Sequence, residues 1–310
     1  MRKVFRANMY FLIILLAEIF GPIALTPIYQ AIGLSDVRII LFLTHMIIFL
    51  LPALIYLIVT KSSFKDTLKL NKLHWKDTLL IILLAFLVQP IMTFFSVIST
   101  FFFNNEIGAF ISQITSTPYI FLLSLVALLP TITEEITIRG IVLSGYENKN
   151  KYIASAVTGL FFGLLHLNAQ QFLYAAVLGF ILALLVRITN SIFSSMIIHF
   201  IVNGTSVTIA KLSSYITSGS SVMGDATELT LKNIELAQKL ILLITYGGIA
   251  IVFASFVFLI IKKLERLNDN RKIESLNYTR GEAILDDERI FNIPFILSII
   301  VYIAGMTIFI

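Results

Sequence analysis

The stretch Leu128-Leu129-Pro130-Thr131-Ile132-Thr133-Glu134-Glu135-Ile136-Thr137-Ile138-Arg139-Gly140 places two adjacent carboxylates and an arginine inside an otherwise apolar run. The run extends from about Tyr119 to Leu143, which is long enough for a helix to cross a bilayer. Ionised side chains at membrane depth are costly, so they normally face a protein interior or a water-filled cavity. The stretch therefore predicts a functional site inside a membrane-spanning helix.

Helical geometry separates the two carboxylates. Glu135 and Arg139 are four residues apart, so they can form an ion pair along one helix face. Glu134 points about 100° away from Glu135 and has no partner within this segment. We therefore expect one neutralised carboxylate and one free carboxylate.

The composition of the whole chain agrees with a membrane protein. Of its 310 residues, 58% are hydrophobic and 13% are charged, whereas about a quarter of the residues in a soluble domain are charged. This predicts an all-α, polytopic integral membrane helix bundle that forms a single membrane domain over 1–310. The absence of cysteine excludes disulfides, thiolate metal sites and a cysteine nucleophile.

Hydropathy predicts nine spans, with eight as the alternative. They cover residues 8–29, 38–59, 78–102, 118–145, 152–168, 171–188, 191–212, 237–261 and 291–310. With a cytoplasmic N-terminus, every Lys and Arg lies in an inside segment except Arg38, Lys211, Lys232 and Lys239. Basic inside loops account for the net charge of +5 without a nucleic-acid partner. The longest hydrophilic stretch, 263–290, is expected to be a cytoplasmic loop.

Two further spans carry histidines in tight local patterns. Gly159 and Gly163 form a GxxxG pair, which lets a neighbouring helix approach closely, and His166 follows them. His199 and Asn203 are four residues apart in a later span and share a helix face. A single intramembrane His or Asn more often joins helices than performs chemistry. Helix joining does not explain so many polar groups on neighbouring helices, because each group is costly to place in a bilayer if it is charged.

The ordered motifs identify a family resemblance. Glu134-Glu135-x-x-x-Arg139, Phe162-x-x-x-His166 and His199-x-x-x-Asn203 occur in this order on successive apolar segments. Over roughly 118–210, the chain resembles the CAAX-protease and bacteriocin-processing (CPBP, or Abi) family of intramembrane endopeptidases. That family includes the type II CAAX prenyl endopeptidases. The resemblance implies that 118–210 is the catalytic core.

The resemblance also implies roles for these residues. Glu134, with His166, would activate water as a general base. The Glu135–Arg139 pair would hold Glu134 in place, and Phe162 would have a supporting structural role. His199 and Asn203 would donate hydrogen bonds to the oxyanion. His166, His199 and a glutamate such as Glu134 could instead hold a catalytic zinc ion. No cofactor is required by the sequence, and zinc stays an alternative.

Three functions agree with these residues. The first is an intramembrane endopeptidase acting near the C-terminus of a membrane-bound peptide or lipidated protein, with membrane lipid as its surroundings. The second is a non-catalytic bacteriocin self-immunity or scaffold protein of the same fold. The third is a proton-coupled transporter, for which the sequence lacks the expected repeats. The abundance of Ile, Phe, Lys and Asn is typical of an AT-rich bacterial genome, so we expect this membrane protein to lie in a bacterial plasma membrane. The isolated Glu18 and His45 are expected to have structural roles.

Overall fold

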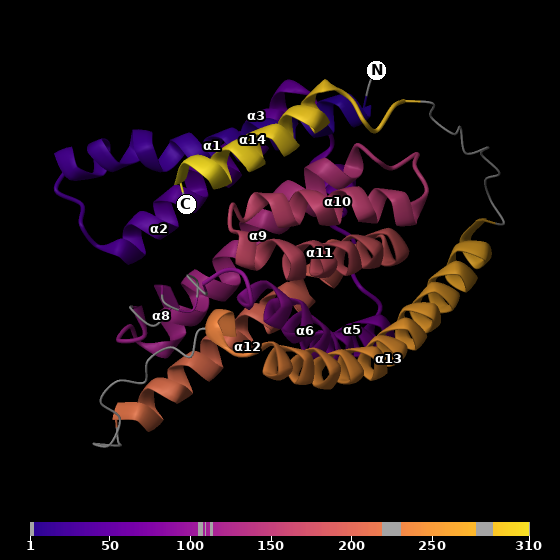
Figure 1. Ribbon diagram of the computed structural model, residues 1–310. Coiled ribbons are helices and arrows are strands. Elements are labelled where there is room, and N and C mark those ends of the chain that lie inside the picture. Colours follow the sequence, from indigo (N-terminus) through magenta and orange to yellow (C-terminus); the bar gives the residue numbers. More distant parts are fainter. Residues whose placement is uncertain are drawn as a thin grey trace.

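All regular secondary structure in the described part of the chain is helical (Figure 1). The computed structural model describes residues 3–104, 108, 110, 111, 114–218, 231–276 and 288–309. Its α-helices are α1 (Lys3–Ala31), α2 (Val37–His45), α3 (Leu51–Val59), α4 (Phe64–Thr67), α5 (Trp75–Leu87), α6 (Gln89–Thr100), α8 (Tyr119–Leu123), α9 (Leu129–Glu135), α10 (Lys151–Leu165), α11 (Ala169–Thr189), α12 (Phe193–Ser218), α13 (Leu236–Leu276) and α14 (Ile293–Phe309). The π-helical segments are η1 (Met46–Leu50), η2 (Ser124–Leu128) and η3 (Ile136–Val142), and η4 (Leu231–Asn233) is a 3₁₀ turn.

Within the described residues, seven helical runs are long and apolar enough to cross a membrane. They are Lys3–Ala31, Val37–Val59, Trp75–Thr100, Tyr119–Val142, Ala169–Thr189, Phe193–Ile216 and Leu236–Arg271. The other two predicted spans correspond to α10 and α14, which have 15 and 17 residues. Helices of this length measure about 22–26 Å, less than the roughly 30 Å of a bilayer core. The predicted count of nine spans is therefore not confirmed.

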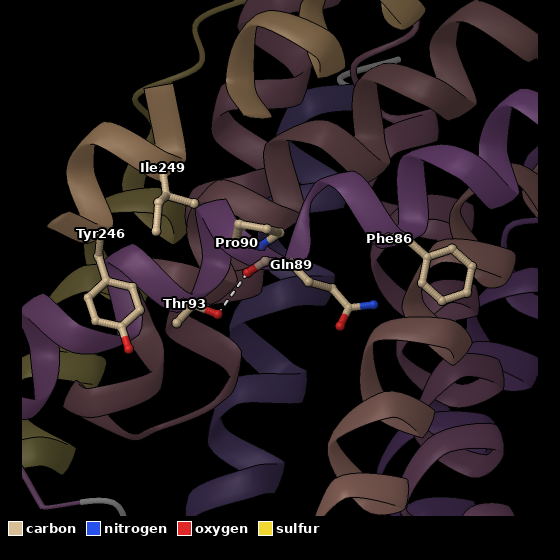
Figure 2. Close-up of a pocket in the computed structure, with 6 residues that line it drawn as sticks. All are labelled: Phe86, Gln89, Pro90, Thr93, Tyr246 and Ile249. Atoms are coloured by element: carbon tan, nitrogen blue, oxygen red, sulfur yellow. Dashed lines mark hydrogen bonds between the residues drawn. The ribbon is translucent and has the colours of Figure 1, made fainter. Parts of the chain in front are cut away.

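Prolines lie at breaks within three of the spans, and Pro52 occupies the first turn of α3. Pro90 lies in the first turn of α6, and Pro130 lies in the first turn of α9. Proline has no N–H, so each helix is interrupted where the carbonyl four residues earlier loses its partner. Beside the break at Pro90, a groove of about 350 Å³ lies between α5, α6 and α13 (Figure 2). Its lining residues are Phe86, Gln89, Pro90, Thr93, Tyr246 and Ile249.

Two clusters of buried apolar side chains form the core. One gathers residues of α1, η1, α3, η3, α10 and α14, and the other gathers residues of α5, α6, α11, α12 and α13. The α10–α11 pair joins the two clusters. These helices pack very closely, since a Cβ at Gly159 would lie 2.6 Å from the backbone nitrogen of Phe180. Only glycine allows this approach, so the GxxxG pair brings α10 and its terminal His166 against α11.

The segments predicted to be inside lie together at one end of the bundle. Lys69 pairs with Glu147 at 2.6 Å, and Arg187 donates to the carbonyl oxygen of Glu147 at 2.9 Å. The same end carries the ion pairs Lys151–Glu265 and Arg271–Asp77 and the bonds from the backbone of Val4 and Phe5 to Glu288. In the predicted cytoplasmic loop 263–290, α13 continues to Leu276, whereas 277–287 lie outside the described residues.

Candidate active site

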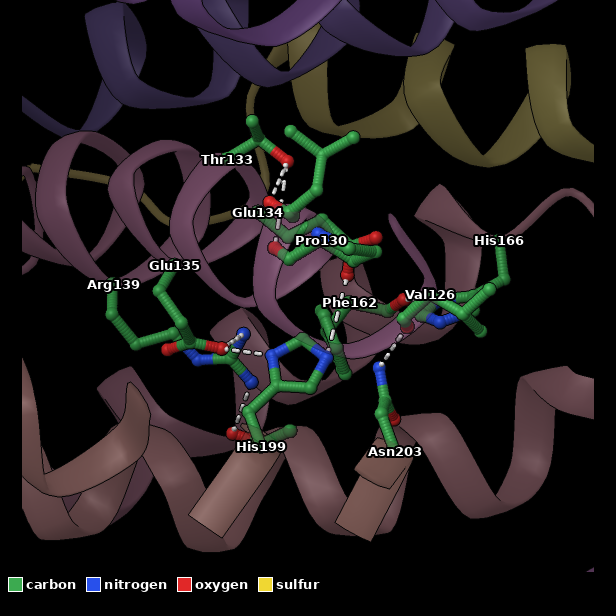
Figure 3. Close-up of polar contacts among 12 residues, drawn as sticks. Val126, Pro130, Thr133, Glu134, Glu135, Arg139, Phe162, His166, His199 and Asn203 are labelled. Carbon is green, nitrogen blue, oxygen red and sulfur yellow. Dashed lines mark hydrogen bonds and ion pairs between the residues drawn. The ribbon is translucent and has the colours of Figure 1, made fainter. Parts of the chain in front are cut away.

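Glu135 is the centre of a buried network that joins three helical segments (Figure 3). Its Oε1 atom accepts hydrogen bonds from Nη1 of Arg139 and from Nδ1 of His199, each at 2.8 Å. The Glu135 and Arg139 side chains are fully buried. Arg139 also donates to the carbonyl oxygen of Gly179 at 3.4 Å and lies 4.1 Å above the ring of Phe162. The expected Glu135–Arg139 pair therefore forms, and it fixes η3 against α10, α11 and α12.

Glu134 is in a different electrostatic situation. Its side chain is 14% exposed, and among the described residues its buried Oε2 atom has no hydrogen-bond partner. Nε2 of His199 lies 3.9 Å from Oε2 of Glu134, which is too long for a direct hydrogen bond. Oε1 of Glu135 is thus paired, although its Oε2 atom also lacks a partner among the described residues, and Glu134 is the partly exposed carboxylate that a ligand or water can reach.

The hydrogen-bond acceptors assign the tautomers of both histidines. Nδ1 of His199 faces the carboxylate of Glu135, and Nδ1 of His166 lies 2.7 Å from the carbonyl oxygen of Phe162. Both partners are acceptors, so each Nδ1 carries a hydrogen and each neutral ring has its lone pair on Nε2. The Phe162 ring contacts both imidazoles edge-on, at 4.8 Å from His166 and 5.5 Å from His199. Phe162 therefore orients both rings.

Asn203 lies one helical turn beyond His199 on α12. Its Nδ2 atom is 3.5 Å from the carbonyl oxygen of Val126. This carbonyl is four residues before Pro130, which has no N–H to donate to it. The proline break thus leaves the carbonyl oxygen of Val126 available, and this oxygen accepts one hydrogen of the Asn203 amide. The second amide hydrogen stays available.

The structure brings the predicted residues together to different degrees. Glu134, Glu135, Arg139, Phe162 and His199 are joined by direct contacts. His166 contacts Phe162 and interacts electrostatically with Glu134, and Asn203 contacts η2. Two residues expected to be structural, Glu18 of α1 and His45 of α2, also lie within electrostatic reach of Glu134. The sequence signal that could have placed Glu18 and His45 near the site was their ionisable side chains at membrane depth.

The proposed metal-ligand set does not assemble here. In the described ranges, no three His, Cys, Asp or Glu side chains are grouped so that they could hold a metal ion. Glu134, His166 and His199 therefore do not fit a three-ligand zinc site in this arrangement. Their chemistry is derived below without a metal.

An apolar helix bundle with carboxylates and histidines converging at membrane depth defines a polytopic membrane protein with a polar intramembrane site. Residues 116–205 match the family described as type II CAAX prenyl endopeptidase Rce1-like. The match contains all three motifs and confirms the resemblance, so this segment is similar to the CAAX protease family of membrane proteases. Comparisons with curated proteins and with solved structures found no match.

Proposed function

We propose that this protein is an intramembrane endopeptidase of the CAAX-processing type. It hydrolyses a peptide bond near the C-terminus of a membrane-associated or lipidated peptide. The observation that carries the proposal is the contrast between the adjacent glutamates. Oε1 of Glu135 accepts hydrogen bonds from Arg139 and His199 and its side chain is fully buried, whereas the Glu134 side chain is 14% exposed and its Oε2 atom has no hydrogen-bond partner among the described residues. A buried, unpaired carboxylate beside two imidazoles is suited to general-base catalysis.

Glu134 and His166 activate the nucleophile in this proposal. A water molecule donates one hydrogen to Glu134 and the other to the lone pair on Nε2 of His166. Glu134 removes a proton as the water oxygen attacks the peptide carbonyl carbon. The Phe162 carbonyl oxygen holds Nδ1–H of His166, so Nε2 stays an acceptor during this step.

His199 and Asn203 stabilise the tetrahedral oxyanion. Because Nδ1–H of His199 is donated to Glu135, Nε2 can donate to an oxyanion only when the ring is an imidazolium. The adjacent Glu135 carboxylate stabilises that cation. The free hydrogen of the Asn203 amide supplies a second donor, and one such donor is typically worth about 3 kcal/mol.

Collapse of the intermediate completes the reaction. Protonated Glu134 returns its proton to the leaving amine nitrogen as the carbon–nitrogen bond breaks. One water is consumed, and the products are a carboxylic acid and an amine, between which the remaining water proton passes to give a carboxylate and an ammonium group. Arg139 does not contact the reacting atoms in this scheme, because it acts by holding Glu135.

The proposal includes the setting of the site. Residues 118–210 form the catalytic core of a single membrane domain over 1–310, in a bacterial plasma membrane with the N-terminus in the cytoplasm. Support comes from the basic segments gathered at one end of the bundle. The site is then open to the cytoplasm, where the C-termini of lipidated proteins are presented.

Comparative peptidomics of membranes tests this function. Membranes with the wild-type protein should contain cleaved C-terminal peptides that are absent with Glu134→Ala, whereas uncleaved precursors should accumulate in the variant. Identical peptide profiles would contradict the proposal. A phenotype such as immunity that survives Glu134→Ala would show that peptidase activity is not the physiological function.

A further inference from the structure

A hydrogen bond connects α2 to the segment that carries Glu134. Nδ1 of His45 lies 3.0 Å from Oγ1 of Thr133, the residue directly before Glu134. Thr133 is fully buried, and His45 is partly buried at the junction of α2 and η1. His45 lies far outside the matched segment 116–205, so this wall of the site comes from another part of the chain.

The hydroxyl of Thr133 fixes the direction of this bond. It faces two carbonyl oxygens that can only accept, those of Leu129 at 3.0 Å and Pro130 at 3.4 Å, and donates its single hydrogen to this pair. Thr133 therefore accepts from Nδ1–H of His45, whose neutral ring then has its lone pair on Nε2. The ring stacks on Phe49, with 5.3 Å between centroids, which limits its rotation.

The segment around Glu134 needs such a lateral contact. Glu134 belongs to α9, which has seven residues and lies between the π-helical segments η2 and η3. Pro130 also removes one backbone hydrogen bond from its first turn. A short helix between two π-helical segments has a less regular hydrogen-bond ladder than a continuous α-helix, and π-helical segments frequently occur at functional sites.

We propose that His45 is a positioning residue for Glu134 and acts through its hydrogen bond to Thr133. The bond holds α9 against α2 and so sets the direction in which the Glu134 carboxylate points. His45 also lies within electrostatic reach of Glu134. This inference rests on the proposed function.

Two substitutions of His45 separate the role of each ring nitrogen. The amide nitrogen of Asn replaces Nδ1, whereas that of Gln replaces Nε2. His45→Gln should therefore lower kcat about tenfold with little change in KM, because a displaced base slows the chemical step. His45→Asn should recover most of kcat. Thr133→Val should lower kcat as much as His45→Gln does. The double variant that carries both substitutions should lose no more kcat than either single variant.

The assay uses purified protein in liposomes and a quenched fluorescent peptide with a prenylated Cys at a C-terminal CAAX sequence. Thr44→Val is the matched control on α2, because its hydroxyl contacts only Tyr29 among the described residues; it should leave kcat unchanged. Additive losses in the double variant, or equal losses for His45→Asn and His45→Gln, would overturn the proposal. If the wild-type protein does not cleave the peptide at all, the proposed function fails instead.

A spectroscopic measurement gives a readout without turnover. The chain has four histidines, so ring ¹⁵N signals in lipid can be assigned by single substitutions. We expect His45 to carry its hydrogen on Nδ1 and to lose this preference in Thr133→Val. A hydrogen on Nε2 in the wild-type protein would contradict the proposed bond, even if Thr133→Val failed to fold.

Discussion

Nδ1 of His199 lies 2.8 Å from Oε1 of Glu135, and both side chains are almost completely buried. This contact couples α9 and α12 through one carboxylate that also binds Arg139 of η3. It assigns the His199 tautomer and supplies the negative charge that an imidazolium needs. The first expected outcome concerns this carboxylate.

Glu135→Gln should damage both stability and activity. The amide removes the charge that compensates Arg139, and breaking a buried ion pair costs about 3–5 kcal/mol. His199 also loses its counter-charge, so kcat should fall by about 100-fold or more. Thermal unfolding in detergent and turnover in liposomes measure the two effects. Glu135→Asp keeps the charge and should recover part of the stability; no difference between Asp and Gln would contradict this role.

Asn203 should affect the chemical step rather than substrate binding. Asn203→Leu removes the second oxyanion donor, so kcat should fall by about 10²–10³-fold while KM changes little. Ser206→Ala is a matched control on the exposed side of the same helix, because the Ser206 hydroxyl bonds only to the carbonyl of Val202 among the described contacts. A loss that appears mainly in KM would assign Asn203 to binding.

The approach of α10 to α11 should be intolerant of a single methyl group. A Cβ at Gly163 would lie 2.8 Å from the carbonyl oxygen of Phe172, whereas one at Gly248 would have no neighbour within 4 Å. Gly163→Ala should therefore destabilise by about 1–3 kcal/mol and lower activity by displacing His166. Gly248→Ala should be neutral or slightly stabilising. Equal unfolding temperatures for the two variants would show that the close approach is not required.

The metal-free mechanism makes a simple prediction. Activity of the reconstituted protein should be unchanged after dialysis against a chelator and unaffected by added zinc. A loss of activity in chelator that zinc restores would overturn the metal-free account and assign Glu134, His166 and His199 as ligands.

Local spacing predicted the parts of this site that lie within single helices. The four-residue separation of Glu135 and Arg139 predicted their ion pair, and the glycine spacing before His166 predicted a close helix contact. The Glu135–His199 and His45–Thr133 bonds join residues far apart in the sequence, so periodicity carried no signal for them. The span count differed because α10 and α14 are shorter than their apolar runs suggested. Neither residue composition nor hydropathy predicted the π-helical segments around α9.

The central claim is that Glu134 is the base that activates water. The most direct test is single-turnover cleavage of the prenylated peptide by wild type and Glu134→Gln in liposomes. The variant should cleave about 10²–10⁴-fold more slowly. It should be no less stable than wild type, since a buried oxygen without a described partner is removed from the carboxylate. Cleavage by Glu134→Gln within tenfold of the wild-type rate would contradict the account.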